Sequence, residues 1–218
     1  MSITLQTRTE SLNTDGQMDD ARPFPNGRWL PVPKSVSDFY IPKEHSDGCR
    51  IVEAAIAILA QGEDLLRELS VDNYTRRVPM AFNASIGGHY RHCLDHFTSL
   101  LRSLDANEVD YDHRERDIRI ESQPDFAFAL TGQMRTQLSQ LSLAVLEAPV
   151  RARCEISYVH GDSPVTTSTL GRELVYAIAH AIHHYALISV MARLMDVTLP
   201  THFGVAPSTV AHHQANAE

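Results

Sequence analysis

The sequence predicts an all-α protein, a four-helix bundle with a small β-hairpin between its third and fourth helices. Four long segments carry apolar residues three and four positions apart, which is the spacing of an amphipathic helix. Alternation of apolar and polar residues is confined to one short stretch before the last of these segments. Helices of this kind bury their apolar stripes against one another, so a single shared core is expected.

The first two helices have clear boundaries in the sequence. The first predicted helix spans residues 46–69. The second follows the candidate N-caps Asn83 and Ser85, and its apolar residues continue to Leu104. A charged connector separates this helix from the third.

The second half of the chain predicts two more helices and the hairpin. Apolar residues recur at helical spacing over residues 125–146, which predicts the third helix. Residues 150–167 alternate around a turn-forming cluster and predict a short hairpin. Ser168 or Thr169 then caps the fourth helix, which Pro200 ends.

The chain is expected to hold one helical domain with two irregular ends. Five prolines between residues 23 and 42 interrupt any regular period, so residues 1–45 are predicted to form a flexible, extended arm. The helical domain is assigned to residues 46–200, and residues 201–218 are predicted to be an irregular tail.

Composition excludes several classes of protein. With 27 acidic against 19 basic residues, the net charge of −8 argues against binding to nucleic acid. The three cysteines form no CxxC pair, and the sequence shows neither a signal peptide nor an uninterrupted apolar run of membrane-spanning length. A soluble, cytoplasmic protein is expected.

A chain of 218 residues buries enough surface to fold without a metal, so any bound metal is expected to be functional.

Histidine is the unusual feature of the composition. Half of the twelve histidines lie in two clusters, one on the second predicted helix and one on the fourth: His89, His92 and His96, then His180, His183 and His184. Two imidazoles four residues apart on a helix, such as His180 and His184, can reach one metal ion. A third imidazole from a neighbouring helix would complete a site with open coordination positions, the form that catalytic metal sites take.

The clusters contain more histidines than one site needs. His89, His96 or His183 could replace a ligand, support one through its second nitrogen, or be an ordinary polar residue. Glu173 lies two turns before His180 and could orient an imidazole or act as a base. A further candidate is the charged run that contains Arg114, Arg116 and Arg119: it is typical of a solvated surface, but one arginine could instead bind a carboxylate substrate.

The two histidine segments, SIGGHYRHCLDHF at residues 85–97 and HAIHHYALI at residues 180–188, resemble those of the DinB-like superfamily of helical bundles. The resemblance implies a divalent metal ion, commonly nickel, zinc or iron, held by His92, His180 and His184. Some relatives are transferases or isomerases that depend on low-molecular-weight thiols, and many have no known reaction.

We therefore expect a divalent-metal-dependent enzyme that transfers a thiol to a small molecule or hydrolyses one, with a low-molecular-weight thiol as a candidate substrate. The alternative is a non-catalytic bundle that binds a metal or ligand, in a stress response or as a structural homodimer. The fourth helix is apolar on more than one face, which predicts a homodimer in either case.

Overall fold

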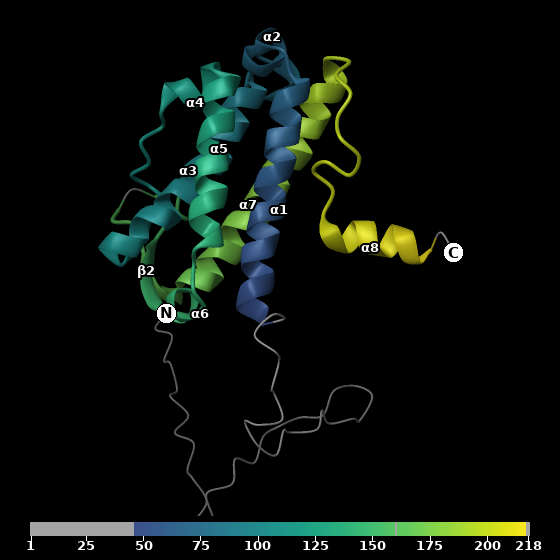
Figure 1. Ribbon diagram of the computed structural model, residues 1–218. Helices are drawn as coiled ribbons and strands as arrows, with labels where there is room; N and C mark the ends of the chain where they lie inside the picture. The colour runs from purple at the N-terminus through teal and green to yellow at the C-terminus, as the bar shows by residue number, and fades with distance from the viewer. Residues whose placement is uncertain (1–45, 160, 217–218) are drawn as a thin grey trace, which may run out of the picture. The chain divides into compact units, whose positions relative to one another are not determined.

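The computed structural model describes residues 46–159 and 161–216 (Figure 1). The arm predicted at residues 1–45 lies outside the described residues. Four long helices dominate the described part: α1 (Asp47–Glu68), α3 (Ile86–Ala106), α5 (Pro124–Ser139) and α7 (Leu170–Leu194). The expectation of a mainly helical fold is confirmed.

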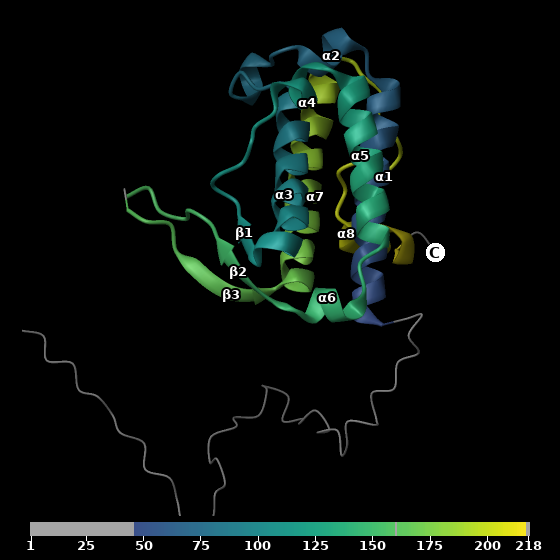
Figure 2. The same ribbon diagram turned by 60° about the vertical axis from the view of Figure 1, so that its left-hand side comes forward.

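The long helices pack in pairs that share one core. Helix α1 packs along α5 and α7, and α3 packs along α7. Figure 2 shows α1 beside α5 and α3 beside α7. The core contains large side chains from all four helices, including Leu59, Phe97, Leu138 and Leu174. The contact between α3 and α7 matters most here, because these two helices carry the histidine clusters.

Side-chain caps fix where three of the long helices begin. Ser46, at the start of α1, accepts a hydrogen bond from a backbone N–H of the first turn. The Ser85 hydroxyl accepts from the N–H of Gly88 at 3.0 Å, and Thr169 accepts from the N–H of Arg172 at 3.2 Å. Each cap satisfies a backbone donor that has no partner within its helix. The caps therefore set where the histidines of α3 and α7 lie along each helix.

The predicted third helix is two helices. Helix α5 ends at Ser139, and a short helix, α6 (Leu143–Glu147), follows it. Ser142 caps α6 by accepting from the backbone N–H of Val145, which starts a new helix instead of continuing the old one. Helix α6 then packs against α7. Apolar spacing continues through the break, so periodicity alone did not reveal it.

The predicted hairpin belongs to a three-stranded sheet. Strands β2 (Pro149–Arg153) and β3 (Val165–Thr169) pair antiparallel, as expected. The connector after α3 adds β1 (Glu108–Asp110), which pairs parallel with β2. A strand of three residues is too short to show a period, and its partner lies about 40 residues away. The connection between β2 and β3 extends away from the helices (Figure 2).

Shorter helices complete the described part. These are α2 (Val71–Thr75), the 3-10 turn η3 (Pro79–Ala81), α4 (Ile118–Ser122) and α8 (Pro207–Ala215). Helix α8 differs from the irregular tail expected at residues 201–218. It starts with Pro207, which is favourable at the first helical position, and it buries no residue, so no apolar stripe indicated it.

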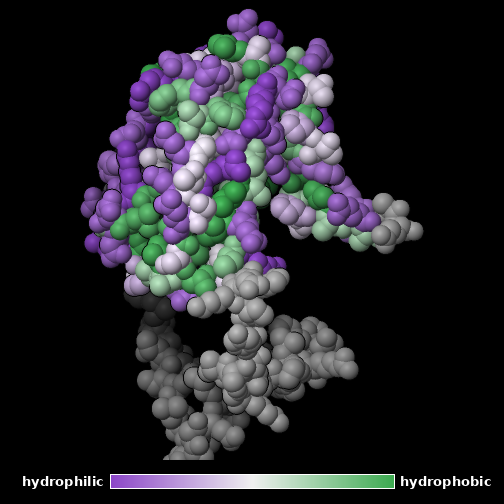
Figure 3. Space-filling model, viewed as in Figure 1, coloured by the Kyte–Doolittle hydropathy of each residue, from purple (hydrophilic) through white to green (hydrophobic). Residues whose placement is uncertain are grey.

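Helix α7 is long and apolar enough to cross a membrane, judged by length and composition alone. The core helix of a protein without a membrane span passes the same test. In this fold α7 packs against α1, α3 and α6 and carries three histidines. Figure 3 shows that apolar residues gather mainly on the lower half of the face in view, with polar residues around them.

One glycine permits the close approach of α1 to the other helices. A Cβ atom at Gly62 would lie 2.4 Å from the hydroxyl oxygens of both Tyr90 and Tyr185. These two rings are fully buried and stacked, with centroids 6.2 Å apart. Because neither ring can move freely, α1 keeps its position only if residue 62 has no side chain.

Gly62→Ala should destabilise the protein although alanine favours helices. Alanine gains up to ~1 kcal/mol in helix propensity, whereas overpacking a core costs about 1 to 3 kcal/mol. Urea unfolding should therefore give a lower free energy of unfolding. Gly132→Ala in α5 is the matched control, because its Cβ would meet only ordinary contacts, and it should leave stability unchanged or raise it. Equal gains at the two positions would contradict the packing argument.

Candidate metal centre

The histidines of α3 and α7 meet between the two helices. His92, His180 and His184 each offer a ring nitrogen, and these atoms lie within 4.8 Å of one another. The Nε2 atoms of His92 and His180 are 3.0 Å apart. The structure thus brings together the three residues that were expected to converge, and their binding of an ion stays a prediction.

One pair of these nitrogens has the separation expected of two ligands of the same divalent ion. Two nitrogens that each lie about 2.0 to 2.1 Å from one ion are roughly 2.9 to 3.4 Å apart at ordinary coordination angles. The 3.0 Å separation of His92 and His180 lies in this range. Three imidazoles suit zinc, nickel or iron better than magnesium or calcium, which prefer oxygen. All three rings are only partly buried, so a small molecule can approach them.

His89 contacts the second nitrogen of His184. The two Nδ1 atoms are 2.9 Å apart, so one ring donates and the other accepts. If His184 donates, its Nε2 keeps a free lone pair, which is the form that binds a metal. His89 therefore lies where it can orient His184, which is the supporting role that the sequence suggested as one alternative for it. His183 is exposed, and its ring centre lies 5.2 Å from that of His184.

Arg114 contacts the cluster from the connector after β1. Its Nη1 atom lies 3.0 Å from Nδ1 of His92 and 3.1 Å from Nε2 of His96. His96 is buried, and its ring centre is 4.0 Å from that of His180. The sequence suggested a solvated surface for the charged run that contains Arg114. The alternative, that one arginine of this run binds a substrate, is closer to the position of Arg114 beside the histidines.

Comparison with known proteins identifies the family of the chain. The family model described as "DinB family" matches residues 60–206, about two thirds of the chain. The protein belongs to the DinB family. A similar curated protein is "FK506-binding protein 5" of the fungus Rhizopus delemar, 28% identical over 161 residues. The match covers 74% of this chain and 37% of that protein, so the chain spans little more than a third of its relative. No solved structure matches.

Burial keeps the histidines of this DinB protein uncharged. It lowers the pKa of His92 and of His180 to about 4 and that of His184 to about 3. Neighbouring groups add to the effect, mainly Arg114 at His92 and the His180 ring at His184. Only unprotonated imidazole binds a metal, and at neutral pH all three rings are uncharged, as metal binding requires.

Glu173 does not orient an imidazole, which corrects one of the two roles expected for it. Its buried carboxylate accepts hydrogen bonds from the Tyr111 hydroxyl at 2.8 Å and from the Ser168 hydroxyl at 2.6 Å. Seven residues of helix separate Glu173 from His180 by about 10 Å along the axis, so it lies too far along α7. Tyr111 in turn packs on His96, with ring centres 5.0 Å apart. Tyr111 therefore lies between the carboxylate of Glu173 and the ring of His96.

Cys93 is inside the core and not in the site. Its side chain is buried, and burial raises the pKa of the thiol well above its usual value. The group therefore stays protonated and packs as a small apolar residue. Among the described residues, the histidines and Arg114 supply the polar atoms next to the candidate metal position.

The metal-free protein should lose stability as the pH falls from about 6.5 to about 4. In that range the histidines of the unfolded chain bind protons, with a pKa near 6.5, whereas the folded rings do not. Each of the three rings should cost on the order of 1 kcal/mol by pH 5. Urea unfolding at pH 7 and pH 5 measures the difference, which should shrink in His184→Gln and stay unchanged in the exposed control His212→Gln. A stability independent of pH would disprove the burial argument.

Proposed function

We propose that this protein is a divalent-metal-dependent enzyme of the DinB type, in which the four long helices form the four-helix bundle of that family. His92, His180 and His184 would hold the ion. The observation that carries the proposal is the convergence of their ring nitrogens within 4.8 Å, from two helices, in a form that is unprotonated at neutral pH.

The proposed reaction is the transfer of a thiol to a small molecule, or the hydrolysis of one. A divalent ion lowers the pKa of a bound thiol or water toward neutrality, which supplies a nucleophile for either reaction. The chain's own residues would position the reactants: His89 lies against His184, and Arg114 lies against His92. Nickel, zinc and iron are all compatible with three nitrogen ligands.

Metal content tests the assignment of the ligands. His92→Ala and His184→Ala should each lower the affinity for a divalent ion by more than tenfold, because each variant lacks one of three ligands. Helix content should be unchanged, since the core is buried without the ion. Elemental analysis of protein purified without a histidine tag gives the result, with exposed His183→Ala as the control. Normal metal content in His92→Ala would show that another histidine is the ligand.

Activity should depend on the ion and on pH in a defined way. Thiol-transfer or hydrolytic turnover should vanish with chelator and return with metal, and it should rise with pH through the pKa of the bound thiol or water. Because the ligand pKa values lie near 3 to 4, metal loss should occur well below pH 6. Metal-replete protein without turnover on a broad substrate panel would favour the non-catalytic, metal-binding alternative.

We also propose that the protein acts in the cytoplasm as a homodimer that uses α7. This helix leaves four apolar side chains 38% to 56% exposed: Val175, Leu187, Val190 and Leu194. Exposed apolar surface of this kind commonly pairs two copies. Light scattering at micromolar concentration should give the mass of a dimer, whereas Val190→Glu should shift it to that of a monomer. A monomeric mass for the unaltered chain would refute the assembly.

A further inference from the structure

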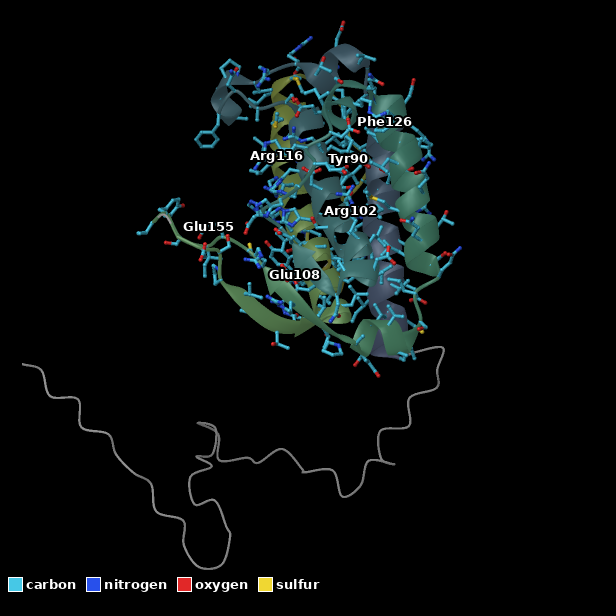
Figure 4. All side chains as sticks on the ribbon, turned by 90° about the vertical axis from the view of Figure 1, so that its left-hand side faces the viewer. Tyr90, Arg102, Glu108, Arg116, Phe126 and Glu155 are labelled. Carbon is cyan, nitrogen blue, oxygen red and sulfur yellow. The ribbon has the colours of Figure 1, made fainter. Side chains whose placement is uncertain are left out.

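An open pocket of about 610 Å³ lies beside Arg114, between the connector after β1 and the connection from β2 to β3. Figure 4 looks onto this side, with Arg116 next to the helices and Glu155 on the connection from β2 to β3. Six charged residues line the pocket, three of each sign: Arg114, Arg116, Arg153, Asp112, Glu155 and Asp162. A pocket with both signs of charge selects against a ligand that carries only one.

Arg114 makes hydrogen bonds but no ion pair in the part of the chain that the structure describes. Arg153 pairs with Glu108 at 3.1 Å, whereas no carboxylate of the described residues lies within ion-pair distance of Arg114. Its hydrogen bonds go to two imidazoles, and its buried Nε has no partner in the described part. A carboxylate is a stronger acceptor for guanidinium than a neutral ring, and it matches the fork of N–H donors.

Asp112 supplies the opposite charge in the same pocket. Its Oδ1 atom accepts the backbone N–H of Glu155 at 2.9 Å, which fixes the orientation of the carboxylate. Its Oδ2 atom is buried and has no donor among the described residues. Buried polar atoms without partners are rare and often mark the position of a missing group. Arg114 and Asp112 are thus two opposite charges of the pocket that hydrogen bonds hold in place and that have no ion-pair partner among the described residues.

We propose that this pocket binds the amino-acid end of a zwitterionic small molecule, with the α-carboxylate on Arg114 and the α-ammonium on Asp112. The inference rests on the proposed function, because Arg114 contacts His92 and would place the rest of the molecule next to the metal centre. It narrows the substrate to compounds with a free amino-acid group. Inorganic phosphate and dicarboxylates satisfy Arg114 but leave Asp112 without a partner and are repelled by it.

Three matched compounds test the two charges separately. S-methyl-L-cysteine carries both charges and no free thiol, so its binding does not report thiol coordination to a metal. Its amide lacks the carboxylate, and its N-acetyl derivative lacks the ammonium. The full chain, freed of metal on a chelating resin, should bind the zwitterion roughly tenfold more tightly than either derivative, as measured by calorimetry or ligand-observed NMR. Equal binding of all three compounds, or no saturable binding of the zwitterion, would overturn the proposal.

Two variants assign each charge to its residue. In Arg114→Gln the zwitterion should bind no better than its amide, and in Asp112→Asn it should bind no better than the N-acetyl derivative. Asparagine keeps an oxygen that can accept the Glu155 N–H, so Asp112→Asn should fold normally. Arg102→Gln is the control for loss of one positive charge, because Arg102 is half exposed, pairs with Glu115 and lies outside the pocket lining. Unchanged affinity in Arg114→Gln would refute the assignment.

The outcomes separate this inference from the proposed function. If the protein binds the zwitterion but has no affinity for a metal, the pocket hypothesis is supported and the metal-enzyme hypothesis is refuted. If the histidines bind a metal but the protein does not discriminate among the three compounds, the metal-centre hypothesis is supported and the pocket hypothesis is refuted.

Discussion

The packing of α3 against α7 is the contact on which the rest of the structure depends. Helix α3 supplies His92, and α7 supplies His180 and His184. The three ring nitrogens come together only because the two helices pack side by side. Gly62 lets α1 approach the stacked rings of Tyr90 and Tyr185, one from each helix, and thereby holds the pair together. The core and the candidate metal centre are thus two consequences of one helix–helix contact.

Placing imidazoles in this contact has an electrostatic consequence. Burial lowers the pKa values of the rings and keeps them uncharged, which metal binding would require and which should cost stability in acid. Arg114 adds a fixed positive charge next to these neutral rings and lowers the affinity of His92 for a proton. The same residue lines the pocket in which we propose that a carboxylate binds.

Membership of the DinB family is consistent with this arrangement, and the fungal relative adds a different kind of information. That relative is named an FK506-binding protein, and the matched region is 37% of its length. A domain of this type can therefore be one part of a longer protein.

The sequence by itself determined the features that depend on local geometry. Helical periodicity located the long helices, and the spacing of four residues put His180 and His184 on one face of α7. The sequence offered more than one cap at some helix starts, and the structure uses Ser85 and Thr169 where Asn83 and Ser168 were also candidates. Which third histidine would join them came from the family resemblance, and the structure places His92 beside them.

Only the tertiary structure decided the contacts between distant segments. The parallel pairing of β1 with β2, the hydrogen bonds of Arg114 to His92 and His96, and the use of Glu173 to hold Tyr111 join residues 18 to 62 positions apart. The break between α5 and α6 is local, yet the apolar spacing continues through it. Periodicity describes one helix or strand at a time, whereas the partner of a charged side chain depends on how the whole chain packs.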